Sequence, residues 1–294
     1  MTVGSWEVAL VAAKWLVLLA TAGAVGAPFV LALARRLQFS ELRAVHDFLQ
    51  SCALTGLFAN TLWFMLQIGA VNRSGVGGMF DMGLGAILLQ SGIGEAWQTR
   101  MLGFTLFTAI TLRPVAAMLP GWGETVGHVA AALMLLASFG ATGHVSTLPA
   151  GVRAALAVHV LAVFLWIGAL PPLLQLSRAA DLPKLQQLMK TFGGQALGIV
   201  AVLIAAGLYL ATHLLHAPAE LLTTHYGRVL LLKLLGLYLL LMLAATNRWL
   251  LVPRLASSGS AVALSKSIRM EWIVALLVLA ATSWMTTIVG PSGM

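Results

Sequence analysis

Long apolar runs separated by short polar or basic stretches dominate the pattern along the chain. A helix that crosses the hydrocarbon core of a bilayer needs about 20 mostly apolar residues. Segments of this kind lie at 8–34, 46–71, 101–119, 125–141, 152–176, 194–215, 228–250 and 268–289, of which the third and fourth are short. The pattern predicts an all-α fold, a polytopic membrane helix bundle with about eight transmembrane helices, with 1–294 as a single transmembrane domain.

The longest connection between these segments is the Gly-rich stretch 72–100. Within it, the apolar run from Leu84 to Gly94 is too short to cross a bilayer, and such a run is typical of an interfacial or re-entrant helix. We therefore expect 72–100 to be an external loop that carries one short interfacial helix.

The composition supports a membrane protein and excludes an ordinary soluble domain. Hydrophobic residues make up 60% of the chain and charged residues 9%, and the mean hydropathy is +0.95. Soluble domains carry about 25% charged residues. Most of the surface must therefore face lipid, so the lipid bilayer is an expected partner.

The basic residues predict an orientation in the membrane. The chain has 17 Lys and Arg against 9 Asp and Glu, a net charge of +8, and these cations are scattered beside apolar runs rather than gathered in a patch for nucleic acid. Cytoplasmic loops are enriched in Lys and Arg. Only Arg73, Arg100, Arg153 and Arg228 fall on one side, whereas the other side holds Arg35, Arg36, Arg43, Arg113, Arg178, Lys184, Lys190, Arg248, Arg254, Lys266 and Arg269. We expect the richer side to be cytoplasmic and both termini to be periplasmic.

Histidine and methionine gather on the predicted external side. Imidazole binds copper and zinc, and thioethers favour Cu(I). His213 and His216 are three residues apart and share a helix face if the helix continues through both. The candidate metal ligands are His144, His159, His213, His216, His225, Met79 and Met82. Ordinary interfacial histidines are the alternative interpretation, and they are the favoured one for His46, whereas His128 fits either.

The predicted fifth span carries a stripe that could line a path through the bundle. His159 and Trp166 are seven residues apart and therefore lie on nearly one face, and Gly168 permits close helix contact. A packed helix interface explains the same stripe equally well. Lys233 lies about one turn inside Arg228 in the seventh span, where a buried lysine is costly unless paired; it could repel cations or bind an anion.

The sequence offers no motif for an enzyme. It has neither a P-loop nor an Asp-Lys-Thr phosphorylation motif, so ATP-driven pumping is not expected. The single cysteine, Cys52, lies in an apolar segment, where a small buried side chain is the favoured interpretation.

Three stretches resemble the copper-resistance protein D family, also called the CopD or PcoD type. They are TGHVS at 142–146, VHVLAVFLWIGALPPL at 158–173 and THYGRVLLLKLLGLYLLLMLAATNRWLLVPRL at 224–255. The most distinctive pattern joins Tyr226, Gly227 and Arg228 to Lys233, Asn247, Arg248 and Pro253. The likeness covers about 128–255, and the first half fits mainly in its span pattern.

The resemblance implies an inner-membrane protein that carries copper from the periplasm, commonly beside a separate CopC-type copper-binding protein. Two other functions stay open. A membrane redox protein could hold haem b between two of His128, His144 and His159. A scaffold could dock a copper chaperone without transport.

Overall fold

The structure, a computed structural model, describes residues 4–40, 42–112, 115, 118–141, 148–178, 182–215, 217, 219–258 and 260–289, without the side chains of 256 and 258. Helices form all the regular structure of these ranges, which confirms the predicted all-α class. The long helices are α1 Ser5–Arg36, α2 Arg43–Asn72, α4 Gly92–Thr111, α6 Gly121–Ala137, α7 Ala150–Ile167, α9 Leu182–Leu214, α11 His225–Thr246 and α13 Val262–Ile288.

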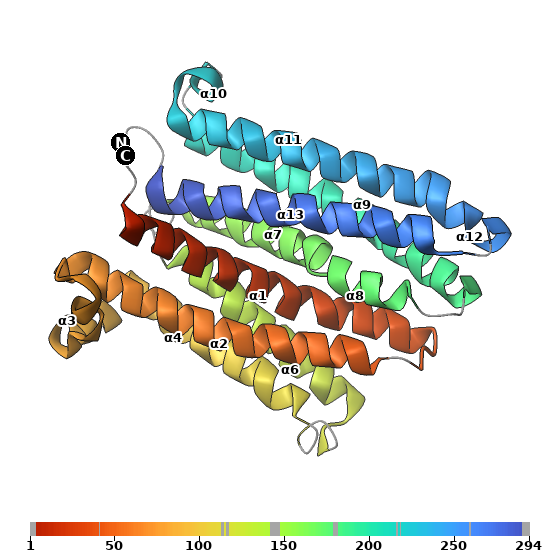
Figure 1. Cartoon of the computed structure of the whole chain (residues 1–294), viewed down its shortest axis with the longest axis horizontal. Helices are drawn as coiled ribbons and strands as arrows, with labels where there is room; N and C mark the ends of the chain where they lie inside the picture. Colours follow the sequence, from red (N-terminus) through yellow and green to blue (C-terminus); the bar gives the residue numbers. More distant parts are fainter. Residues whose placement is uncertain are drawn as a thin grey trace.

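Shorter helices extend or connect the long ones (Figure 1). They are the 3-10 helices η1 Gly75–Phe80 and η2 Ser138–Gly140, the α-helices α3 Met82–Leu89, α8 Leu170–Leu176, α10 Glu220–Thr223 and α12 Val252–Ser258, and the π-helix η4 Asn247–Leu251.

Six of the described helices, with their extensions, are long and apolar enough to cross a membrane. They are Ser5–Arg36, Arg43–Asn72, Gly121–Gly140, Ala150–Leu176, Leu182–Leu214 and His225–Leu255. The structure is therefore a helical membrane bundle, whereas the predicted count of eight crossings is not confirmed. Helices α4 and α13 lie in the same bundle but are not among the six.

The helix nearest the predicted span 101–119 is α4, which occupies Gly92–Thr111 instead. Its start is fixed by Ser91, whose hydroxyl accepts a hydrogen bond from the Ile93 N–H, and by Glu95 in the first turn. Both features stabilise a helix N-terminus. Residues 92–100, expected in the external connection, are therefore the first turns of a long helix, and the short helix before them is α3.

Helix α1 is the centre of the bundle, where it packs against α2, α13 and α7. Buried residues make up 72% of its most apolar window, against 11% for α9 and for the helix that begins with α11. The α1 backbone touches the end of α7, because a Cβ added at Gly168 would lie 1.7 Å from the Ala22 carbonyl oxygen and one at Gly26 would lie 2.2 Å from the Gly168 carbonyl carbon. Glycine is required at this crossing because only a backbone without Cβ permits that approach.

The bundle has two distinct ends (Figure 1). The start of α1, the end of α13, α3 and α10 lie at one end, here called the α3–α10 end, and the opposite one is the α12 end. The helix bounds place Arg73, Arg153 and Arg228 toward the α3–α10 end. They place the larger basic set toward the α12 end, in its described members Arg35, Arg36, Arg43, Arg178, Lys184, Lys190, Arg248, Arg254, Lys266 and Arg269.

Candidate functional site

His159 lies half-buried between α7 and α9. Its Nδ1 is 3.2 Å from the carbonyl oxygen of Leu203, and a Cβ added at Gly207 would lie 3.2 Å from its Cε1. A carbonyl oxygen only accepts, so Nδ1 carries the proton and donates it. The neutral ring therefore has its lone pair on Nε2, the arrangement in which histidines usually bind metal.

A cation accompanies this imidazole. Lys233, half-buried on α11, lies close enough to His159 for its charge to act on the ring. Two like charges at short range repel each other. Lys233 therefore opposes a metal cation at His159.

Trp166, predicted on the same stripe as His159, belongs to the main core and is 2% exposed. Seven residues of α-helix separate the two by about 10 Å along the axis. The stripe thus combines a core tryptophan with a histidine that faces α9.

The other described candidates lie toward the α3–α10 end and are mostly exposed. His213 is exposed at the end of α9, with Nδ1 3.0 Å from the Tyr209 carbonyl oxygen, so its lone pair is also on Nε2. His225 is the exposed first residue of α11, three residues before Arg228, whose Nε donates to the Leu222 carbonyl at 3.2 Å.

Met79 and Met82 lie on another side of this end. Met82 is 87% exposed, whereas Met79 packs with Trp6 against Gly69. The α13 and α1 helices lie between α11 and α2 (Figure 1), so these methionines are separated from His213 and His225. The structure therefore does not bring the two sets together.

His144 and His216 lie outside the described residues, as does any joint site of His213 with His216. Within the described ranges, no three His, Cys, Asp or Glu side chains are close enough together to hold one metal ion.

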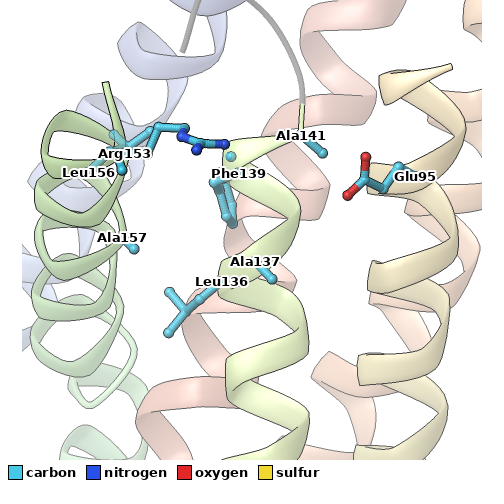
Figure 2. A pocket seen from close by; sticks show the side chains of 10 residues that line it. Glu95, Leu136, Ala137, Phe139, Ala141, Arg153, Leu156 and Ala157 are labelled. Atoms are coloured by element: carbon cyan, nitrogen blue, oxygen red, sulfur yellow. The ribbon is translucent and has the colours of Figure 1, made fainter. Parts of the chain in front are cut away.

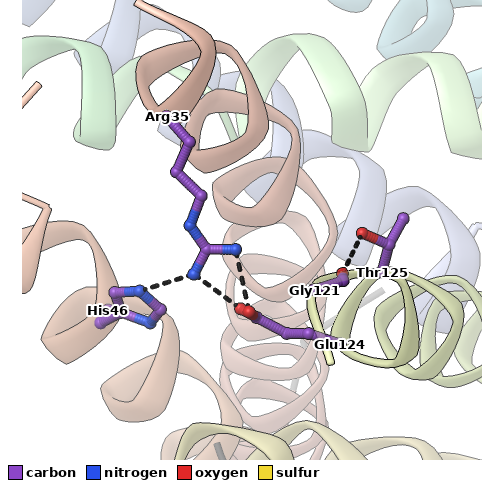
Figure 3. Close-up of polar contacts among 5 residues, drawn as sticks. All are labelled: Arg35, His46, Gly121, Glu124 and Thr125. Carbon is purple, nitrogen blue, oxygen red and sulfur yellow. Dashed lines mark hydrogen bonds and ion pairs between the residues drawn. The ribbon is translucent and has the colours of Figure 1, made fainter. Parts of the chain in front are cut away.

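A polar network ties three helices together near the α12 end (Figure 3). Arg35 on α1 binds Glu124 on α6 through Nη1 and Nη2, each at 2.9 Å, and its Nη2 lies 3.1 Å from Nε2 of His46 on α2. A guanidinium only donates, so His46 accepts with its Nε2 lone pair. In the sequence, Arg35 stands out only as a topology signal, and the one signal for Glu124 is that it is a carboxylate beside an apolar span.

His128 is buried one turn along α6 from Glu124. It is 8% exposed and stacks on Phe107 of α4, with ring centroids 5.7 Å apart. Its Nε2 is buried without a hydrogen-bond partner among the described residues. Since His128 faces α4 and His159 faces α9, these two do not form the facing pair that a haem requires, and the geometry gives the haem alternative no support.

Arg100, expected in the external connection, is 4% exposed inside the bundle. Its Nε donates to Ser138 Oγ at 2.9 Å, and its guanidinium carbon lies 5.0 Å from the ring centroid of Trp63 and 5.4 Å from that of Phe139. Hydrogen bonding and two aromatic faces thus hold a buried cation.

A pocket of about 510 Å³ opens near Arg100, between α4, α6 and α7. Figure 2 shows the Arg153 guanidinium and the Glu95 carboxylate on two sides of it, with Phe139 between them. Its lining joins one cation and one anion to apolar residues, and it holds no histidine.

Comparisons with known proteins cover most of the chain. The model for the copper resistance protein D-like N-terminal domain matches 5–152, just over half of the chain, and that for copper resistance protein D matches 186–285. No solved structure matches.

Two curated relatives match at low identity. The inner membrane protein YebZ of Escherichia coli is 27% identical over 251 residues, which cover 81% of this chain and 83% of YebZ. The copper transport protein CutJ of Bacillus subtilis is 24% identical over 252 residues, which cover 82% of this chain but 45% of CutJ. With two family models that together extend from Ser5 to Met285, the chain belongs to the copper resistance protein D family of membrane proteins.

Proposed function

We propose that this protein carries copper across the bacterial inner membrane, from the periplasm to the cytoplasm. Family membership supports copper handling, and one relative is named a copper transport protein. The observation that carries the proposal is His159, a half-buried imidazole in a membrane helix whose Nδ1–H is held by the Leu203 carbonyl. Its Nε2 lone pair can replace part of the hydration of a copper ion.

Helix α9 supplies two such positions at different depths. His213 donates to the Tyr209 carbonyl near the end of α9, and His159 donates to the Leu203 carbonyl, six residues deeper. At 1.5 Å per residue, these two carbonyls are about 9 Å apart along the axis. An ion that leaves water needs successive ligands that bind it without trapping it, and we assign His213 to the outer step and His159 to the inner one.

We propose that the exposed side chains at the α3–α10 end capture the ion first, either directly or from a separate CopC-type periplasmic protein. His213, His225 and Met82 are exposed there, and Met79 precedes Met82 by three residues. His144 and His216 complete the proposed ligand set.

This direction requires that the α3–α10 end face the periplasm, in agreement with the basic α12 end. We propose α4 and α13 as the remaining two crossings, which leave both termini outside. A cysteine at Ser74 should react with an impermeant maleimide in intact cells, and a cysteine at Ser257 should react only after lysis, both in a Cys52→Ala background. The reverse pattern would contradict the orientation.

Copper uptake into proteoliposomes tests the function. Wild-type protein should accumulate isotopically labelled copper faster than protein-free vesicles, and equal rates would reject transport. His159→Gln should abolish most of the difference, because an amide N–H can still donate to Leu203 while the imidazole lone pair is lost.

His46→Gln is the matched control, since His46 is also a half-buried histidine on a membrane helix but its Nε2 already accepts from Arg35. It should retain uptake and copper stoichiometry. Loss of uptake in both variants, or in neither, would remove His159 from the path.

A further inference from the structure

Glu271, on α13, is a buried carboxylate that the proposed copper path does not use. It is 3% exposed, and among the described residues no other Asp or Glu is buried. Its carboxylate is hydrogen-bonded to the side-chain amide of Asn247. Asn247 is the first residue of η4 and part of the Asn-Arg pattern that carries the family resemblance.

No charged side chain in the described residues compensates Glu271. The elements packed against α13 are α1, α8, α11 and η4. Arg248 points toward Gly193 of α9, Arg35 binds Glu124, and Lys14 donates to the Thr286 carbonyl. Helix α8 carries no ionisable residue. Among the other cations of these elements and of α13, Lys233 exerts its charge on His159, and the rest are exposed: Arg36, Arg228, Lys266 and Arg269.

Unpaired oxygen atoms lie close by. Asn247 Oδ1 and Ser267 Oγ are buried without hydrogen-bond partners in the described part of the chain, and Ser267 precedes Glu271 by one helical turn on the same face. An ionised carboxylate in this setting would have one neutral donor, and a single neutral hydrogen bond does not offset the loss of hydration of a buried carboxylate.

One proton neutralises the carboxylate and gives the amide oxygen a donor. A protonated Glu271 donates its O–H to Asn247 Oδ1 once the amide is turned by 180°, and amide orientation is assigned from such networks because its O and N atoms look alike. The pair then holds a neutral acid and a satisfied amide oxygen, and no buried charge remains.

The backbone at Asn247 is irregular, which is a further sign of a functional position. The Val252 N–H bonds to the Asn247 carbonyl, five residues back, immediately before Pro253. Gln186 on α9 donates to the Val252 and Pro253 carbonyls at 2.9 and 3.2 Å. Single π-turns inside helices often occur at functional sites, and this one brings Asn247 against α13.

We propose that Glu271 and Asn247 form a proton-binding site, in which Glu271 binds a proton at neutral pH and exchanges it with water at the α12 end. Glu271 is nine residues from the start of α13, or about 14 Å along the helix. The site is independent of the copper ligands, and metal-free protein suffices to test it.

Infrared spectroscopy of the full-length purified protein reads the proton directly. At neutral pH, the wild type should show a carboxylic-acid C=O stretching band that Glu271→Gln removes and the exposed control Glu95→Gln retains. The band should move to lower frequency in D₂O while the protein stays folded. An absent band would overturn protonation, and a band that never shifts in D₂O would overturn exchange.

Two further measurements do not depend on the folding of Glu271→Gln. Incorporation of ¹³C-labelled glutamate into the wild type should shift the band, whereas ¹³C-aspartate should not. Asn247→Leu should keep the band but raise its frequency, because the O–H loses its acceptor. A band present in choline buffer but abolished by sodium would instead identify a bound cation and overturn the proposal.

Discussion

His46 and His159 are both half-buried histidines on long membrane helices, yet their rings bind opposite kinds of partner. Near the α12 end, His46 accepts a hydrogen bond from the Arg35 guanidinium, so the lone pair on its Nε2 is occupied. Arg35 also forms an ion pair with Glu124, and the network therefore joins α1, α2 and α6. Between α7 and α9, His159 donates to a backbone carbonyl, which leaves its lone pair on Nε2. The ring nitrogen that is already bonded therefore separates a histidine that holds helices together from one that can bind an ion.

The largest effect on the network side should come from Glu124→Ala. The substitution removes the carboxylate that compensates the positive charge of Arg35 beside His46, at a position where the side chain of Glu124 is only 14% exposed. We expect about 2 kcal/mol of lost stability, since the bidentate pair is strong but partly solvated. Thermal unfolding in detergent measures it, and copper binding by the folded variant should be unchanged.

Asp47→Ala is the matched control for that prediction. Asp47 pairs with Arg43 at 3.9 Å with both side chains exposed, and such pairs contribute about 0–0.5 kcal/mol. Equal losses in the two variants would show that the Arg35 network has no special structural role.

On the ligand side, Lys233→Met should raise the copper affinity of His159. It removes a cation whose charge acts on His159, and repulsion between like charges at a partly solvated site is worth about 1–2 kcal/mol. The dissociation constant should fall about tenfold when measured by competition with a chromogenic copper chelator. Weaker binding would mean that Lys233 supports the site rather than opposing it.

His46→Leu should lower stability while leaving copper binding unchanged. It removes the acceptor for Arg35, and a hydrogen bond to a charged group contributes about 1.5 kcal/mol. Metal analysis should give the wild-type copper stoichiometry, and a lower value would place His46 among the ligands.

The smallest effect should come from Gly207→Ala, whose new Cβ would lie 3.2–3.3 Å from the His159 ring. The imidazole must move by a few tenths of an ångström, which weakens its bond to Leu203, and we expect a few-fold loss of copper affinity. Gly198→Ala on the same helix is the control, since its Cβ would meet nothing within 4 Å. Identical affinities in the two variants would show that this packing does not set the ligand geometry.

The membrane helices could be predicted because length and apolar composition are local properties of the chain. Helix α4 was misplaced because its start depends on the cap at Ser91 and because a charged residue, Arg100, is buried inside it. That burial depends on Ser138, Trp63 and Phe139, which come from other helices and leave no pattern near residue 100.

The candidate site was predictable only as residue types. His159 was singled out from its helix position, but its hydrogen bond to Leu203 joins residues 44 apart in sequence. The Arg35, Glu124 and His46 network likewise exists only after α1, α2 and α6 pack. Spacing in the sequence predicts which residues are neighbours on one helix, but it does not predict which faces of different helices pack together.

Helix α9 contains 33 residues, which corresponds to about 50 Å of helix, whereas the hydrocarbon core of a bilayer is about 30 Å thick. Such a helix must tilt or project into the headgroups, and the choice depends on the acyl-chain length of the surrounding lipids. His159 and His213 are both hydrogen-bonded to carbonyl oxygens of α9. A change in bilayer thickness that tilts or shifts α9 should therefore change the depth of both imidazole rings in the membrane. Lipid thickness is thereby an external control on where an ion could be bound.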